Sequence, residues 1–238
     1  TSSGKTSIAL DLCQKFDGEI ISADSRQVCR FMDIGTGKVP LKSDINIKKF
    51  TDHWKLNNVK VWGYDLVNPD KYFSGYDFAD YALKKAEEIF GKGKTVFLVG
   101  GTGFYVDLFT GKIRPSKVLP DLSLRDSLEK LSLFDLQNKL KKLDEKAFQN
   151  IDQKNKVRLI RAIEKELSTD VREEQLPYLD SAEFTYIGLT GERNYLYKRV
   201  DNWVDEIWDD GLIDEVKSLL KMGYGDSSKI KGIVYKEV

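Results

Sequence analysis

Residues 1–6, Thr-Ser-Ser-Gly-Lys-Thr, have the side chains and the spacing of a loop that binds phosphates. Ser-Gly-Lys-Thr matches the second half of the pattern G-x-x-x-x-G-K-[ST], in which backbone N–H groups and a lysine surround phosphates at a helix N-terminus. Gly4 would let the backbone approach a phosphate, Lys5 would neutralise it, and the Thr6 hydroxyl could ligate Mg²⁺. The alternative is an ordinary helix start, because half a motif is not specific by itself.

A helix is expected directly behind this loop, because Ile8, Leu12 and Phe16 recur at helical spacing. Gly18 is predicted to cap its C-terminus. A strand normally leads into a phosphate loop and none precedes Thr1, so we expect that the given sequence starts inside its motif.

A second polar group, Asp24-Ser25-Arg26-Gln27, follows a short apolar run at 19–23 that predicts a buried strand. Ligands of open α/β sheets bind at the carboxyl ends of the strands, so we expect Asp24 near the phosphate loop. The same carboxylate could instead form an Asx-turn or cap a helix. Both interpretations stay open at this point.

The third group comes where an apolar strand predicted at 95–99 runs into Gly100-Gly101-Thr102-Gly103 and a helix. The start of that helix would supply a second cluster of unpaired N–H donors, and two such turns could hold one diphosphate between them. The glycines could also serve only close packing of helix on strand.

The elements that must position these groups alternate between strands and helices. We expect a strand at 184–190 and helices at 76–90, 192–209 and 211–222, the first ended by Gly91 and the last by Gly223. In the helix at 192–209, the side chains predicted to face the core are Leu196, Val200, Val204 and Ile207. The lysine-rich stretch 41–60 is weakly patterned and indicates no chemistry.

From Arg114 to Pro177 strand-like runs vanish and helical patterns follow one another, which indicates a helical insertion. Within it Lys154, Arg158, Arg161 and Lys165 share one helix face, either as a solvated surface or as a stripe that follows phosphates. Two further arginines, Arg193 and Arg199, could grip an anion at the start of the next helix from two directions.

The composition excludes some functions. Lys+Arg and Asp+Glu both number 38, so the net charge is +0, and a nucleic acid could bind only at a local basic patch. The single His53 cannot form a histidine metal site, and no long apolar run predicts a membrane span. Cys13 and Cys29 lack metal-ligand spacing and predict reduced thiols, so we expect a cytoplasmic protein.

Taken together and in order from Ser3 to Glu237, eight motifs resemble the tRNA dimethylallyltransferase family. They are S-G-K-T, I-S-A-D-S-R-Q-V, D-I-G-T-G-K, L-V-G-G-T-G-F-Y, V-R-L-I-R-A-I-E, E-R-x-x-L-Y-x-R-V-D, G-L-I-D-E-V and Y-K-E. The resemblance implies an α/β fold: a P-loop NTPase-like parallel sheet core at 1–113 and 183–238, with an all-helical tRNA-binding insertion at 114–182. It also implies a longer chain beyond Glu237.

The activity implied is transfer of a dimethylallyl group from dimethylallyl diphosphate to N6 of the adenosine 3′-adjacent to the anticodon of tRNA. We expect a monomer that uses Mg²⁺ and grips the anticodon stem-loop. The resemblance assigns diphosphate binding to Ser2, Ser3, Gly4, Lys5 and Thr6, with the metal at Thr6. It assigns catalysis to Asp24, Thr102, Arg193 and Arg199, Asp24 being the proton acceptor, and tRNA contacts to Asp24, Ser25, Arg26, Gln27, Thr102, Arg158 and Arg161.

Three positions depart from the family pattern. Cys29 stands where a tyrosine is usual, Trp203 where a third arginine of the long helix is usual, and Val234 where a glycine precedes Tyr-Lys-Glu. Three other functions remain as alternatives. One is an adenylate dimethylallyltransferase, one is a P-loop kinase for a small metabolite that would bind ATP, and one is a non-catalytic RNA-binding protein.

Overall fold

The computed structural model describes residues 3–38, 45–173, 175–179 and 181–238. It consists of two compact units, one formed by Thr1–Arg114 with Leu176–Val238 and the other by Pro115–Gln175. The smaller unit ends before residue 182, the limit predicted from the sequence, and residues 176–182 belong to the larger one. The predicted site of Ser2 lies outside the described residues.

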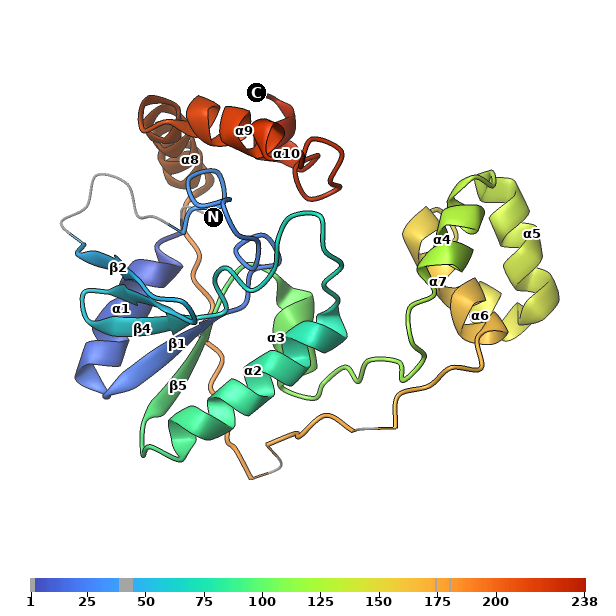
Figure 1. Cartoon of the computed structure of the whole chain (residues 1–238). Helices are drawn as coiled ribbons and strands as arrows, with labels where there is room; N and C mark the ends of the chain where they lie inside the picture. Colours follow the sequence, from blue (N-terminus) through green and yellow to red (C-terminus); the bar gives the residue numbers. More distant parts are fainter. Residues whose placement is uncertain (1–2, 39–44, 174, 180) are drawn as a thin grey trace. The chain divides into compact units, whose positions relative to one another are not determined.

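The larger unit is built on a five-stranded sheet with the order β2-β3-β4-β1-β5 (Figure 1). The inner strand β1 (Gly18–Ser22) pairs in parallel with β4 (Val59–Trp62) on one side and β5 (Thr95–Val99) on the other. Beyond β4 the sheet continues with β3 (Trp54–Leu56) and then β2 (Ile47–Lys49), each antiparallel to its neighbour. The sheet confirms the predicted α/β fold.

Helices cover both faces of this sheet, and successive residues of β1 point to opposite sides. Ile20 packs in one apolar cluster with Leu10 of α1 (Lys5–Lys15). Ile21 packs in another with Phe78 of α2 (Gly75–Phe90) and Leu108 of α3 (Gly103–Phe109). Because side chains alternate along a strand, a strand buried on both faces carries a continuous apolar run.

The hairpin between β3 and β4 went unpredicted. Asn57 and Asn58 join the two strands with φ angles of 48° and 68°. Two successive residues with positive φ form the type I′ turn that matches the twist of a two-residue hairpin, and asparagine tolerates this conformation well. The alternation of Trp54, Leu56, Val59 and Val61 around Asn-Asn was therefore the available signal.

The strand predicted at 184–190 is wrong, since this segment has no regular secondary structure. Within the described residues β5 pairs only with β1. Residues of β5 and of this segment, among them Phe97, Phe184 and Tyr186, line one cavity of about 400 Å³. An apolar run cannot form a strand where no backbone lies within hydrogen-bond reach.

Three further helices complete the larger unit: α8 (Arg193–Asp209), α9 (Leu212–Lys221) and α10 (Ile233–Lys236). The helices predicted at 192–209 and 211–222 are confirmed. The predicted core face of α8 is buried only at Ile207: Leu196 is half-buried, and the prediction is wrong for Val200 and Val204, which are 36% and 45% exposed. Periodicity shows which side chains share a face, but not whether another element covers that face.

The glycines predicted to end helices have different roles. Gly91 is the C-cap of α2, and Gly223 follows α9 with φ 86°. Gly18 does not cap α1, which ends at Lys15; it begins β1 instead. A Cβ on Gly18 would lie 2.4 Å from the Phe97 ring, so the glycine makes room for an aromatic side chain on the neighbouring strand.

The smaller unit is helical where regular structure is described, with α4 (Leu122–Glu129), α5 (Leu133–Leu143), α6 (Glu145–Gln149) and α7 (Lys156–Leu167). Side chains that cap all four helices accept backbone hydrogen bonds; they are Asp121, Ser132, Asp144 and Asn155. Leu136, Leu140 and Ile163 form the core of this unit. Among the helices described, none combines the length and the apolar composition needed to cross a bilayer.

Candidate active site

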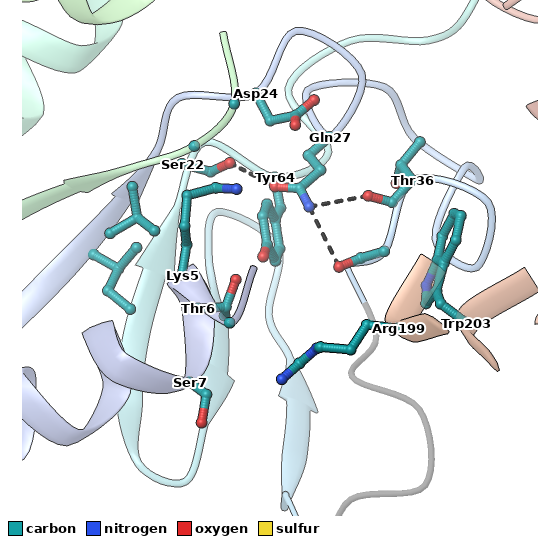
Figure 2. A pocket seen from close by; sticks show the side chains of 16 residues that line it. Lys5, Thr6, Ser7, Ser22, Asp24, Gln27, Thr36, Tyr64, Arg199 and Trp203 are labelled. Carbon is teal, nitrogen blue, oxygen red and sulfur yellow. Dashed lines mark hydrogen bonds between the residues drawn. The ribbon is translucent and has the colours of Figure 1, made fainter. Parts of the chain in front are cut away.

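A cavity of about 230 Å³ lies where the start of α1 meets the carboxyl end of β1 (Figure 2). Six of the residues assigned to the site from the sequence line it, namely Gly4, Lys5, Thr6, Asp24, Gln27 and Arg199. Figure 2 shows Lys5 extending from α1 toward the end of β1, while Arg199 and Trp203 come from α8. The structure thus brings the phosphate-loop residues and Asp24 to one cavity.

The start of α1 presents backbone donors to this cavity. Gly4, the N-cap residue of α1, adopts φ 83°, a left-handed conformation that favours glycine, and it has no side chain with which to cap the helix. The first amides of a helix have no partner within it, so those of Lys5, Thr6 and Ser7 are available to an anion. Lys5 Nζ donates to Ser3 Oγ at 3.2 Å, which keeps the ammonium group beside the loop.

Asp24 follows β1 directly and is half-buried. Its Oδ1 accepts a hydrogen bond from the backbone N–H of Arg26 at 2.9 Å, which is an Asx-turn. The carboxylate also lines the cavity, where its second oxygen lies across from Gly101. Asp24 therefore both forms an Asx-turn and lies near the phosphate loop, so the two interpretations left open by the sequence are compatible. The turn fixes the direction of the carboxylate.

The turn between β5 and α3 packs against the residues on either side of Asp24. A Cβ on Gly100 would lie 2.0 Å from the carbonyl oxygen of Ala23, so close backbone packing requires this glycine. Thr102 Oγ1 accepts from the backbone N–H of Ser25 at 3.0 Å. Gly100 and Gly101 line the cavity and Thr102 does not, so Thr102 supports the residue next to Asp24.

The sequence did not point to Ser22, Thr36 or Tyr64, all of which line the cavity. Gln27 Nε2 donates to the carbonyls of Thr36 and Gly37 at 3.1 and 3.3 Å, and its Oε1 accepts from Ser22 Oγ at 2.7 Å. Burial, and then the negative charge of Asp24, raise the pKa of Tyr64, so its hydroxyl stays protonated at neutral pH. The glycines of D-I-G-T-G-K were the available signal for Thr36.

The arginines expected at the site have separate positions. Arg199 lines the cavity and its guanidinium donates to the Tyr195 hydroxyl at 3.1 Å. Arg193, the first residue of α8, is exposed and is not part of the cavity wall. Arg26 Nη1 donates to the carbonyl of Lys229 at 2.7 Å, so this side chain holds the C-terminal segment.

A family model described as IPP transferase matches residues 27–238. The chain belongs to the IPP transferase family. This confirms the family predicted from the motifs.

Curated relatives carry a name that states their reaction. A tRNA dimethylallyltransferase of Acetivibrio thermocellus is 37% identical, in an alignment that covers 100% of this chain and 75% of the relative. A tRNA dimethylallyltransferase of Thermotoga maritima is 36% identical, in an alignment that covers 100% of this chain and 76% of the relative. A crystal structure of the tRNA isopentenylpyrophosphate transferase from Bacillus halodurans aligns with a TM-score of 0.63 at 35% identity, covering 100% of this chain and 73% of that one.

Against the IPP transferase pattern, the three departures lie in different environments. Trp203 lines the cavity, next to Arg199. Cys29 is fully buried in the core, and Val234 packs against the same apolar cluster. Of these three residues, only Trp203 lines the candidate site, whereas Cys29 and Val234 contribute to the packing of the core.

The two arginines of α7 differ in what they contact. Arg158 on α7 is exposed. Arg161 binds the fully buried carboxylate of Glu164 and donates to the carbonyl of Val118 at 2.8 Å. Of these two arginines, Arg158 is therefore solvated, whereas Arg161 ties α7 to the segment before α4.

Proposed function

We propose that this member of the IPP transferase family transfers the dimethylallyl group from dimethylallyl diphosphate to N6 of the adenosine 3′-adjacent to the anticodon of tRNA. The observation that carries the proposal is the single cavity shared by Lys5, Thr6 and Asp24. A phosphate-binding helix start and a carboxylate in one cavity can hold a diphosphate and an amine that react with each other. The names of the curated relatives support the same reaction.

The reaction forms a bond between N6 of adenine and C1 of the dimethylallyl group, and breaks the bond from C1 to the diphosphate oxygen. An exocyclic adenine amine is a weak nucleophile, so Asp24 orients it and accepts its proton as the bond forms. Diphosphate leaves with the electron pair of the broken bond. Lys5, Arg199 and the first amides of α1 stabilise its growing negative charge.

We also propose that the reaction uses a divalent metal ion, and we expect this ion to be Mg²⁺. Within the described residues no cluster of three or more His, Cys, Asp or Glu side chains could hold a metal by itself. Mg²⁺ needs no such cluster, because it retains waters and binds through substrate phosphates with one or two protein oxygens. The Thr6 hydroxyl in the cavity wall fits that role, and the ion would neutralise charge on the diphosphate.

We propose that the helical unit binds the anticodon stem-loop, and that exposed Arg158 provides a phosphate contact there. The target base must leave its stack, and a loop offers one that unstacks at low cost. The exposure of Ser25 beside Asp24 supports a contact of this residue with the tRNA next to the target base. A cavity formed by one chain supports a monomer as the acting form.

The molecule that accepts the transferred group distinguishes this function from its alternatives. The protein is incubated with labelled dimethylallyl diphosphate and either tRNA or AMP, and separately with labelled ATP. We expect label in tRNA at the adenosine next to the anticodon, none in AMP and no phosphoryl transfer from ATP. Label in AMP would instead identify an adenylate dimethylallyltransferase, and ATP turnover without prenyl transfer a kinase.

A further inference from the structure

The loop 33–38, between β1 and the hairpin, is held by a carboxylate from a distant helix. Glu215 of α9 accepts hydrogen bonds from the backbone N–H groups of Asp33 and Ile34 at 2.8 Å each, and of Gly35 at 3.1 Å. Three successive amides that converge on one carboxylate form an anion-binding turn, here filled by a residue of the same chain. The contact fixes the backbone of the loop.

Tyr235 completes this clamp. Its hydroxyl donates to Glu215 Oε1 at 2.7 Å, and burial followed by the charge of Glu215 raises its pKa, so it remains a donor. A Cβ on Gly35 would lie 2.7 Å from Cζ of the Tyr235 ring. Only glycine therefore allows the ring to lie against the loop while Glu215 holds the amides.

The same loop extends to the cavity wall. Thr36 and Gly37 line the cavity, and their carbonyls accept both hydrogen bonds from Gln27 Nε2. With its NH₂ group held there, the Gln27 amide presents its oxygen to Ser22 Oγ at 2.7 Å. A flipped amide would place its oxygen against two carbonyl oxygens, so the loop determines how Gln27 faces the cavity beside Asp24.

We propose that Glu215 is a positioning residue for prenyl transfer, which acts through the loop 33–38 on Gln27 and the cavity wall near Asp24. This rests on the proposed function. Glu215 itself is not in the cavity wall, so it affects the reaction only through residues that are. Transfer reactions depend steeply on such alignment, since a shift of about 1 Å can cost on the order of 100-fold in rate.

The test measures prenyl transfer to tRNA by wild type, Glu215→Gln, Gln27→Leu and the double variant. A glutamine at 215 presents one acceptor oxygen in place of two and turns an NH₂ group toward backbone donors. We expect Glu215→Gln to lower kcat roughly 10- to 100-fold while the KM for dimethylallyl diphosphate stays within about 2-fold, because the amides of α1 are untouched. In the Gln27→Leu background, the same substitution should lower kcat no further.

Asp214→Asn is the matched control, because Asp214 precedes Glu215 on α9 and its side chain is 86% exposed. Tyr235→Phe removes one donor to Glu215 and serves if Glu215→Gln does not fold; we expect a smaller loss of kcat with the KM for the diphosphate again unchanged. Glu215→Gln with the kcat of Asp214→Asn, or losses that multiply in the double variant, would overturn the proposal. A wild type that prenylates no tRNA would instead refute the proposed function.

Discussion

Asp24 uses one carboxylate oxygen to form an Asx-turn and keeps its carboxylate in the cavity wall. The chemical type of a residue and its place after a strand were enough to predict this position. Tyr64 and Thr36 could not be found in the same way, because Tyr64 follows a hairpin that went unpredicted and Thr36 lies in a loop held by the distant Glu215. Local sequence therefore predicts which residues can do chemistry better than it predicts which residues line the cavity.

At the same scale, the two arginines of α7 give opposite predictions. Arg158→Ala should weaken tRNA binding and reduce the slope of log affinity against log salt concentration by roughly 1, with no loss of stability. Arg161→Ala should instead destabilise the helical unit, because it leaves the buried Glu164 carboxylate with fewer partners. Filter binding over a range of salt, beside thermal unfolding, checks both. An Arg158→Ala variant with the salt slope of wild type would contradict the assignment.

Among the elements, those with strong periodicity were predicted correctly and those that depend on a neighbour were not. The helix α2 combines an apolar stripe with a capping box at Ser74 and Asp77, so its own sequence specifies both its face and its start. The segment 184–190 has the composition of a strand but no paired neighbour in the described structure. A strand is defined by its partner, and no local pattern supplies that information.

The loop 33–38 also depends on a buried cation. Lys38 is fully buried and its Nζ lies 2.8 Å from Asp33 Oδ1 and 2.6 Å from Asp65 Oδ1. Lys38→Met should lower the free energy of unfolding by about 3 kcal/mol, because it leaves two poorly solvated carboxylates without their shared cation.

Lys49→Met is the matched control, since Lys49 pairs with the same Asp33 but is 52% exposed, and we expect less than about 1 kcal/mol there. Denaturant unfolding of both variants measures the difference. Equal losses for the two lysines would show that burial of Lys38 does not matter.

At the scale of the whole molecule, the net charge of +0 gives no overall attraction to RNA, so the tRNA binding proposed for this chain would need a local basic patch. In the smaller unit, burial acts to raise the pKa of Glu164, but hydrogen bonds from Arg125, Arg161 and the Asp121 backbone outweigh it and lower that pKa below its ordinary value of 4.5. A carboxylate with a lowered folded-state pKa stabilises the fold above its unfolded-state pKa. That stability is lost as the pH falls through the lowered value.

We therefore expect hydrogen-exchange protection of α7 in the full chain to fall as the pH drops below about 4.5. Glu164→Gln should reduce protection already at neutral pH and flatten its dependence on pH. The exposed Glu129→Gln, whose carboxylate is 53% accessible and pairs with Lys156 at 3.4 Å, should behave as wild type. Protection in Glu164→Gln that still falls as steeply as in wild type would assign the acid sensitivity to another group.

The central claim is that Asp24 accepts the proton of an amine that attacks C1 of the dimethylallyl group, while the start of α1 holds the diphosphate that leaves. Single-turnover transfer of labelled dimethylallyl to tRNA by Asp24→Asn tests it most directly, because asparagine keeps the shape of the side chain and loses its basicity. We predict a transfer rate lower by about 10²- to 10⁴-fold, with the affinities for dimethylallyl diphosphate and tRNA within a few-fold of wild type. Transfer at the wild-type rate by Asp24→Asn would contradict the claim.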